Sequence, residues 1–333
     1  MPTPVSPALE DVAPVVRPDA SASPRLDGAA LRPPAGKAKR ARALRGDNMG
    51  MAPWLFVGPA LLALFLFFGL PVAGALVLSL TDFDIYGIGD AGTARFVGLR
   101  NYAAILQSAE FWNALGNTLY FVVAGGPLSV AVSLGAAMLV SNRLVRFKPF
   151  WRTVFFAPVV TTIVAVAVVW RYLYHPRVGL LNHVLGTEID WLGDPAWAMP
   201  SIIALAVWKN FGYNMVIFIA GLANIPAELY EAARIDGAGP WARFRYVTVP
   251  SLAPTFLFVG LLTMIGYFQL FAEPYVMTQG GPLESTMSVV LLMYAEGFRW
   301  WNMGYAAALA FVLFAIILAA TLVQMRLQRR ADA

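Results

Sequence analysis

The sequence contains no cysteine and only two histidines among its 333 residues. Without cysteine, a disulfide framework, a thiolate nucleophile and a cysteine-ligated metal are all excluded. His175 and His183 lie eight residues apart in one short polar stretch, and no cluster of acidic residues accompanies them. Because this spacing does not suit a compact metal site, we predict two histidines in water-facing loops and no bound metal.

Charged residues are scarce as well. They make up 13% of the chain, whereas a soluble domain carries about a quarter. Hydrophobic residues make up 59%, and the mean hydropathy is +0.64. Such a chain cannot cover its own surface with polar groups, so lipid must form much of its surroundings. The net charge of +5 comes from basic residues that flank apolar runs rather than sharing one face, so no nucleic-acid partner is expected.

Long apolar runs divide the sequence into predicted membrane spans, each near or above the roughly 18 residues that suggest a bilayer crossing. Only helices and closed barrels satisfy the backbone in lipid, and these runs lack the period-two alternation of barrel strands. Internal glycines and prolines indicate close helix packing and kinks. We therefore predict an all-α membrane protein, a bundle of six transmembrane helices at about 53–80, 113–140, 153–174, 200–223, 251–276 and 303–325.

The distribution of lysine and arginine predicts the orientation of these spans. Of the 24 basic residues, 18 fall in the two terminal tails and in the second and fourth connections. Five fall in the other three connections, and Lys209 lies within a span. Since basic residues stay on the cytoplasmic side, both termini are predicted to be cytoplasmic.

Residues 1–47 differ from the rest of the chain in composition. They are rich in Pro, Ala and Arg without a periodic apolar pattern, which predicts a disordered cytoplasmic tail. They also lack the order of charge, apolar region and cleavage site of a signal peptide. Met49 and Met51 precede the first span and leave a start at that point open, although the basic residues of the tail would anchor that span. Residues 48–333 form the predicted transmembrane domain.

The fourth connection, residues 224–250, carries the most informative pattern. It is typical of two short helices joined by a hinge. Pro226 suits a first helical turn, Gly237 and Gly239 can supply a left-handed stop, and Pro240 can begin the next helix. Several alanines leave the first helix thin on one side. A thin, rigid helix projecting into the cytoplasm is suited to the groove of another protein.

This connection resembles the signature loop, or EAA motif, of permeases in binding-protein-dependent ATP-binding-cassette (ABC) importers. The family pattern is Glu-Ala-Ala, three residues, Gly, nine residues, an aliphatic residue, one residue, an aliphatic residue and Pro. Valine occupies both aliphatic positions here, where the family more usually has Ile and Leu. The ATPase-coupling loop that the resemblance implies contains Glu231, Ala232, Ala233, Asp236, Gly237, Val247, Val249 and Pro250.

Three further segments look like the carbohydrate-importing, maltose-type branch of this family: Phe96–Tyr102, Trp208–Asn214, and Thr278–Pro282 with Thr286. The resemblance implies a multi-pass permease of the bacterial inner membrane. Its implied partners are a second permease, two ATP-binding-cassette ATPase subunits and a periplasmic binding protein that delivers a sugar or sugar derivative. In such importers, closure of the ATPases moves the permease loops and drives alternating access.

The implied subunit is not an enzyme by itself. The sequence has no glycine-rich run that ends in Gly-Lys-Ser or Gly-Lys-Thr, so it lacks the usual phosphate-binding loop. We expect no catalytic residues and no cofactor on this chain, with ATP and magnesium on the partner ATPase.

Polar and aromatic residues in the fourth and fifth spans are candidates for the substrate path. A sugar needs hydrogen-bonding side chains and aromatic faces, and polar groups in a span should face a cavity or another helix. Two of the candidates lie four residues apart and therefore share a helix face. Alternatively, these groups join helices, with Lys209 and Glu273 as partners. The candidates are Asn210, Tyr213, Asn214, Tyr267, Gln269 and Glu273.

Other functions remain open from the sequence. A permease for a polyamine or another polar solute would carry the same coupling loop. A secondary transporter would show inverted repeats and ionisable groups within the membrane, for which Lys209 and Glu273 are the candidates. A membrane-embedded enzyme would need a nucleophile with a base, or a metal cluster, inside the spans.

Overall fold

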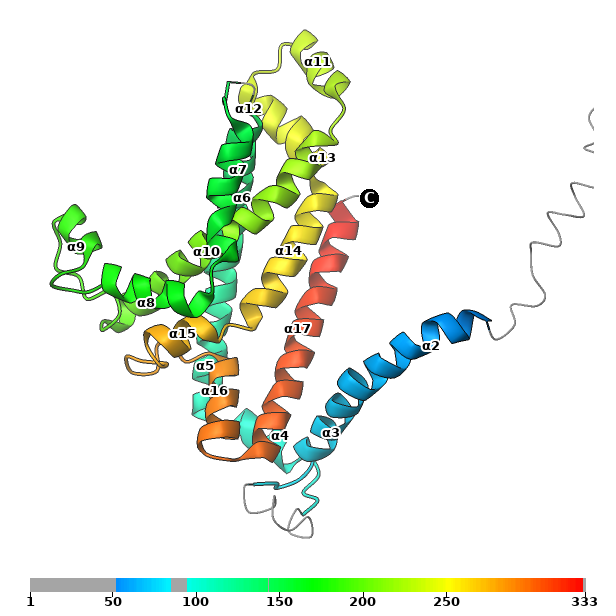
Figure 1. Cartoon of the computed structure of the whole chain (residues 1–333), viewed down its shortest axis with the longest axis vertical. Helices are drawn as coiled ribbons and strands as arrows, with labels where there is room; N and C mark the ends of the chain where they lie inside the picture. The colour runs from blue at the N-terminus through cyan, green and yellow to red at the C-terminus, as the bar shows by residue number, and fades with distance from the viewer. Residues whose placement is uncertain (1–51, 85–94, 143, 332–333) are drawn as a thin grey trace, which may run out of the picture. The chain divides into compact units, whose positions relative to one another are not determined.

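The computed structural model describes residues 52–84, 95–142 and 144–331 (Figure 1). The described chain is almost entirely helical, with one isolated antiparallel β-bridge between Thr81 and Phe96. The chain divides into two compact units, Met1–Phe65 and Leu66–Ala333. The predicted disordered tail, residues 1–47, lies outside the described residues.

The first unit contributes helix α2 (Ala52–Leu64), which carries Pro59 in its interior. The helix runs on through the π-helical turn η1 (Phe65–Gly69) into α3 (Leu70–Ser79). Together they give a candidate membrane span of 26 residues, Trp54–Ser79, with a mean hydropathy of 2.6. The first predicted span, 53–80, thus coincides with a long apolar helix.

Short and long helices alternate in the second unit. Long ones supply candidate spans, in which the π-helical turns (η) η1 and η3 also lie, and short ones occupy the connections. After α3 the elements are α4 (Arg100–Gln107), α5 (Ala109–Tyr120), η3 (Phe121–Gly125), α6 (Gly126–Ser141), α7 (Lys148–Val160), α8 (Ile163–Leu173), α9 (Leu180–Leu185), α10 (Pro195–Ala223), α11 (Ala227–Ile235), α12 (Pro240–Arg243), η4 (Phe244–Thr248), α13 (Val249–Ser251), α14 (Ala253–Phe268), α15 (Ala272–Met277), α16 (Val289–Tyr294), η5 (Ala295–Arg299) and α17 (Met303–Ala331).

Four helices of the described chain are long and apolar enough to cross a membrane: Trp54–Ser79, Ala109–Ser141, Pro195–Ala223 and Met303–Leu327. Two bent pairs pass the same test together. Lys148–Val160 and Ile163–Leu173 are bent by 97°, and Pro240–Ser251 and Ala253–Phe268 by 69°. The number of spans is thus four, or up to six if each bent pair counts as one.

The predicted third span, 153–174, is not a straight helix. The α-helix ends at Val160, and Thr161 and Thr162 adopt extended backbone conformations before α8 begins. The Thr161 hydroxyl donates to the Pro158 carbonyl at 2.6 Å, a local hydrogen bond that competes with the helical ladder. The sequence prediction missed this break because both threonines sit inside an apolar run.

The predicted fifth span, 251–276, is also interrupted. Helix α14 ends at Phe268, and Gln269–Phe271 separate it from the short helix α15. The fourth span, in contrast, begins five residues before the predicted boundary. There Asp194 accepts a hydrogen bond from the Ala196 amide at 2.8 Å, and Pro195 takes the first helical position, which is a favoured way to begin a helix.

Helix α10 is central to the second unit. It packs along α6 and α7, while α14 lies beside both α6 and α17 (Figure 1). Gly212 allows the close approach of α10 to α7, because a methyl group there would overlap the Phe155 carbonyl oxygen. Buried residues between α6, α10 and α14 include Met215, Phe218 and Val259. These contacts fix the helices that surround the candidate site.

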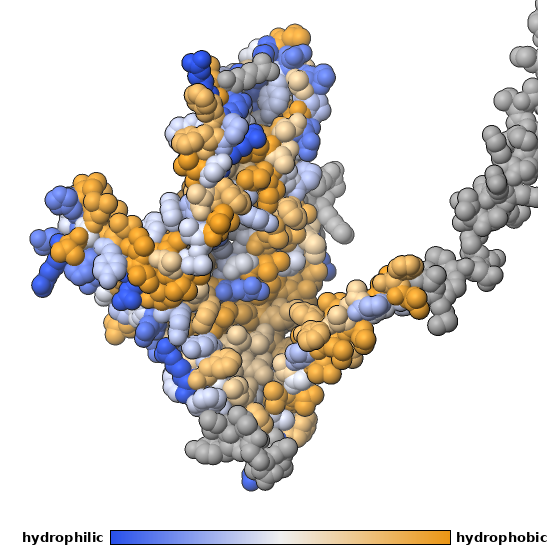
Figure 2. All heavy atoms as spheres, in the orientation of Figure 1, coloured by the Kyte–Doolittle hydropathy of each residue, from blue (hydrophilic) through white to orange (hydrophobic). Residues whose placement is uncertain are grey.

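Connections lie at two opposite ends of the second unit. The α6–α7 corner, helices α11–α13 and the end of α17 lie at one end, and the α3–α4 and α16–α17 connections lie at the other (Figure 1). Hydrophobic residues cover much of the helical shafts, whereas hydrophilic residues gather around α11 and α9 (Figure 2). This distribution is that of a bundle with an apolar middle and polar ends.

Candidate functional site

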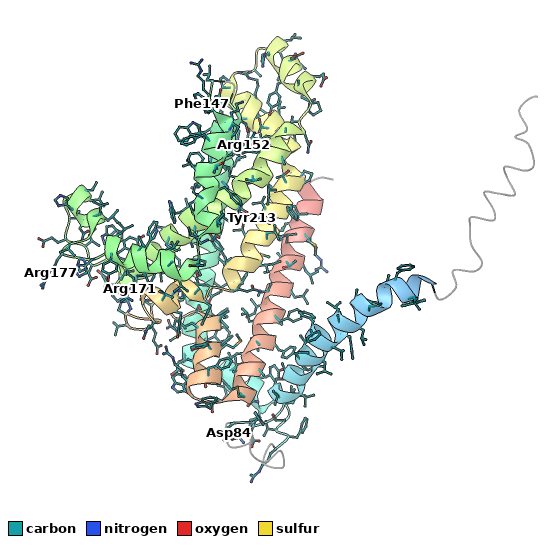
Figure 3. All side chains as sticks on the ribbon, viewed as in Figure 1. Asp84, Phe147, Arg152, Arg171, Arg177 and Tyr213 are labelled. Atoms are coloured by element: carbon teal, nitrogen blue, oxygen red, sulfur yellow. The ribbon has the colours of Figure 1, made fainter. Side chains whose placement is uncertain are left out.

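A cavity of about 650 Å³ opens between α7, α8, α10 and α14. Its lining includes Asn210, Tyr213, Asn214, Tyr267, Gln269 and Glu273, the six residues predicted for the substrate path. Figure 3 marks Tyr213 on the part of α10 that passes α14. The sequence prediction therefore identified residues that the fold brings together from two helices and a helix break.

Both helix breaks contribute to this cavity. Val159 and Ile163, on either side of the α7–α8 break, line one wall. The segment Gln269–Glu273, which joins α14 to α15, lines another. In a continuous helix the backbone groups hydrogen-bond to one another, whereas an interrupted helix turns polar side chains toward an enclosed space. The two breaks inside the predicted third and fifth spans thus lie at the site itself.

Some of the polar groups also join helices. Asn214 donates from Nδ2 to Thr263 Oγ1 at 2.9 Å, which links α10 to α14. Lys209 donates from Nζ to the Val159 carbonyl at 3.0 Å, which links α10 to α7. Lys209 and Glu273 both line the cavity but form no direct ion pair among the described residues. The alternative role in helix contact thus applies to Asn214 and Lys209, through partners other than Glu273.

Tyr267 differs from its neighbours because both its ring and its hydroxyl are buried. The side chain is 5% exposed, and its ring packs against Phe121 at 4.7 Å between centroids. Gly125 leaves room for this ring, since a Cβ there would lie 3.0 Å from Tyr267 Cε2. Tyr267 Oη and Ser129 Oγ are both buried, and neither makes a hydrogen bond of standard geometry among the described residues. The side chains of Ser129 and Asn210 lie beside the Tyr267 hydroxyl. Because the hydroxyl is buried, the cavity wall has to shift before a polar molecule in the cavity reaches it.

The loop Thr278–Thr286 holds the wall formed by Gln269–Glu273. Thr278 and Thr286 hydroxyls lie 2.7 Å apart, and Thr286 donates to the Gly281 carbonyl at 2.7 Å. Ser288 then donates to the Leu270 carbonyl within the α14–α15 break. The polar residues that look like the carbohydrate branch here bind one another and position the cavity wall.

The segment Phe96–Tyr102 stabilises the end of α3 in a similar way. Asn101 donates from Nδ2 to the carbonyls of Ser79 and Thr81 at 2.9 and 2.8 Å. These carbonyls lie at the C-terminal end of the helix, where they have no helical partner. The amide thus fixes the entry of the chain into the next span.

The predicted coupling loop contains the two short helices expected, α11 and α12. Gly237 adopts φ +75°, and Ala238 donates to the Ala233 carbonyl at 2.8 Å while Gly237 donates to Arg234 at 3.0 Å. This pattern is the Schellman ending of a helix, which favours glycine at the left-handed position. Gly239 was also predicted for the left-handed stop, but its φ of −68° is ordinary, so Gly237 alone ends α11.

Helix α11 stands on the surface with no buried residue. Glu231, Ala232, Asp236 and Gly237 are exposed, and Ala233 is half-buried. The helix is tied to η4 by the hydroxyls of Tyr230 and Thr248, which lie 3.0 Å apart. The motif residues of α11 therefore face outward from a helix that is held in place. Pro250 lies in α13, at the far end of the loop.

Large apolar side chains are exposed on the same loop, and sequence reasoning missed them. Ile235 is 87% exposed, and Leu229, Trp241 and Tyr246 are exposed as well. Contiguous exposed apolar groups mark surfaces for protein or membrane contact. Their signal was present in the sequence as bulky apolar residues within a short, charged connection.

Comparisons with known proteins agree with the resemblance of the loop to a permease motif. The family model described as "Binding-protein-dependent transport system inner membrane component" matches residues 129–333. The lactose transport system permease protein LacF of Rhizobium radiobacter is 35% identical over 273 residues, which cover 79% of this chain and 89% of that protein. The sn-glycerol-3-phosphate transport system permease protein UgpA of Agrobacterium fabrum is 35% identical over 281 residues, 82% of this chain and 93% of that protein.

A solved structure shares the fold. It is that of a bacterial alginate ABC transporter in complex with an alginate pentasaccharide-bound periplasmic protein. One of its chains matches with a TM-score of 0.71 and 20% identity, over 89% of this chain and 97% of that one. The coupling loop, the family match and the full-length relatives together show that this chain belongs to the family of inner-membrane permease components of binding-protein-dependent ABC importers.

Proposed function

We propose that this chain forms, with a second and distinct permease, the path by which an ATP-driven importer carries a sugar or sugar derivative across the bacterial inner membrane. The observation that carries this proposal is the cavity of about 650 Å³ beside α10 and α14. It combines amide groups, tyrosine hydroxyls and aromatic faces, which suit a neutral molecule dense in hydroxyls. The relatives named for lactose and for sn-glycerol-3-phosphate support the same substrate class.

The polyamine alternative fits this cavity less well. A polycation would need several carboxylates around it, whereas Glu273 supplies the one carboxylate in the lining and Lys209 adds an ammonium group beside it. Neutral hydrogen-bonding groups dominate instead. A sugar can use them without the cost of burying an unpaired charge.

The coupling function belongs to α11 and the turn after it. We assign the motif residues Glu231, Ala232, Ala233, Asp236 and Gly237, with Pro250, to docking of the partner ATPase, which holds ATP and magnesium. Exposed Ile235 and Trp241 supply the apolar part of the same surface. Because α11 is fixed to η4, and η4 leads through α13 into α14, closure of the ATPases would move a helix that lines the cavity. In this assignment α11 and both chain termini face the cytoplasm, and a periplasmic binding protein delivers the substrate at the other end.

The test removes the hydroxyl oxygen of one residue that lines the cavity. Tyr267→Phe deletes a buried hydroxyl that makes no hydrogen bond of standard geometry among the described residues, so the permease should assemble normally. If that hydroxyl binds the substrate, the loss of about 1 kcal/mol lowers apparent affinity about fivefold. Uptake by the assembled importer in proteoliposomes, measured over a range of sugar concentrations, separates affinity from maximal rate.

Tyr174→Phe is the matched control. Its hydroxyl is also buried, but it donates to the Ser201 carbonyl at 3.0 Å and lies outside the cavity. This variant should melt at a lower temperature and keep its affinity for the sugar. Alanine variants of Asn210 and Gln269 extend the test. If Tyr267→Phe and both alanine variants transport like the wild type, or fail only by not assembling, the substrate path does not run along these residues.

A further inference from the structure

A second hollow lies on the corner between α6 and α7, at the end of the bundle that carries α11. It encloses about 500 Å³. Its walls are apolar, and one guanidinium group stands at its edge. The lining residues are Leu139, Val140, Val145, Arg146, Phe147, Trp151 and Phe155.

Aromatic side chains around this hollow are strongly exposed. Phe147 is 79% exposed, Phe150 is 59% exposed and Trp151 is 42% exposed. The rings of Phe150, Trp151 and Phe155 follow one another along α7 with centroids 5.5 and 5.9 Å apart. Aromatic rings at the end of a membrane span prefer the level of the lipid headgroups, so this row marks the membrane boundary on α7.

Phe147 is held in an unusual backbone conformation. Its φ of 57° and ψ of 44° lie in the left-handed region, which a bulky residue rarely adopts. Glycine would occupy this position with less strain. An aromatic ring is nevertheless present there, exposed and beside the hollow. The chain thus has a large apolar side chain at a position where the backbone conformation alone would favour glycine.

One guanidinium group, that of Arg146, lines the hollow, and that of Arg152 lies next along α7, outside the lining. Arg146 and Arg152 are exposed and form no ion pair among the described residues, and Figure 3 shows Phe147 and Arg152 toward the same end of α7. Lys148 donates from Nζ to the carbonyl of Ser141, the last residue of α6, at 3.1 Å. The sequence contains no Asp or Glu between Glu110 and Glu188. The counter-charge must therefore come from another part of the chain or from another molecule.

We propose that this hollow binds an anionic phospholipid, with an acyl chain against Trp151 and Phe155 and the phosphate near Arg146, while Arg152 adds positive charge on the same helix. Charge complementarity selects this occupant. A neutral lipid or an apolar protein segment would fill the hollow but make no use of the guanidinium group of Arg146 at its edge. Free phosphate would meet the charges and leave the apolar walls empty. Basic pockets between membrane helices are known to bind anionic headgroups.

The experiment titrates the full-length chain in neutral detergent with phosphatidylglycerol or phosphatidylcholine and counts bound lipids by native mass spectrometry. We expect phosphatidylglycerol to bind more tightly. The double variant Arg146→Gln with Arg152→Gln should weaken that binding tenfold or more, as basic residues near a lipid surface do. Phe147→Gly should weaken it severalfold while the protein melts no lower than the wild type, because glycine suits the backbone. Arg326→Gln, an exposed charge at the same end but away from the hollow, is the matched control and should bind normally.

Four results would overturn the proposal. The two lipids could bind equally, the double variant could bind phosphatidylglycerol like the wild type, or inorganic phosphate could displace it at equal concentration. The fourth concerns the assembled importer: if the complex with its partner permease and ATPase retains no phosphatidylglycerol that the double variant loses, a protein partner covers the hollow. None of these results depends on which solute the importer carries.

Discussion

Replacing Gly212 with alanine tests how closely α10 and α7 must pack. A Cβ at this position would overlap the Phe155 carbonyl oxygen and lie 3.1 Å from the Phe156 Cα. Both contacts are with backbone, which cannot rotate away as a side chain can. The two helices would have to separate, and the bond from Lys209 to the Val159 carbonyl crosses the same seam.

Inserting one methyl group into a packed interior costs about 1–3 kcal/mol. Alanine also favours a helix over glycine by about 1 kcal/mol, so the net destabilisation is smaller than the packing cost alone. Gly135→Ala in α6 is the matched control, because nothing lies within 4 Å of its Cβ position. We expect Gly212→Ala to lower the apparent melting temperature of the detergent-solubilised chain and Gly135→Ala to maintain or raise it. If Gly212→Ala melts at or above the wild-type temperature, the close α7–α10 contact is not as described.

Two other predictions concern the coupling loop and the orientation. Gly237→Val forces a β-branched residue into a left-handed turn and should abolish transport and weaken ATPase co-purification. Gly237→Asn tolerates that conformation and should retain most of both. Equal behaviour of the two variants would show that the turn is not required. Reporter fusions at Asp194 and Leu283 should read periplasmic and those at Arg146 and Ala238 cytoplasmic, and a single reversed fusion would break the proposed orientation.

Much of the site could be predicted from sequence because its residues are conspicuous in a chain with so little polarity. An asparagine or glutamine within an apolar helix needs a partner or a cavity, so Asn210, Asn214 and Gln269 were identifiable without a structure. The helical repeat places residues 210 and 214 on one face, and the structure brings both to the cavity. Gly237 was identifiable because glycine followed by proline soon after a short helix is a recurring ending.

The helix breaks could not be predicted by the same reasoning. Hydropathy averages over a window, and the windows around Thr161 and Gln269 remain apolar although the helices stop there. The decisive interactions are local hydrogen bonds such as that of Thr161 with Pro158, which add little to any average. The role of Thr286 was hidden for a different reason, since its partners Thr278 and Gly281 are set by the folding of a loop.

The central claim is that this chain is one half of a permease pair that imports a sugar. The most direct test is uptake into proteoliposomes that contain this chain, a second permease and their ATPase, with the binding protein outside. We predict ATP-dependent uptake of a radiolabelled sugar from a panel of mono- and oligosaccharides, and no uptake when the second permease is left out. Uptake without the second permease would show that this chain acts as a homodimer, and uptake of a polyamine with none of any sugar would contradict the proposed substrate class.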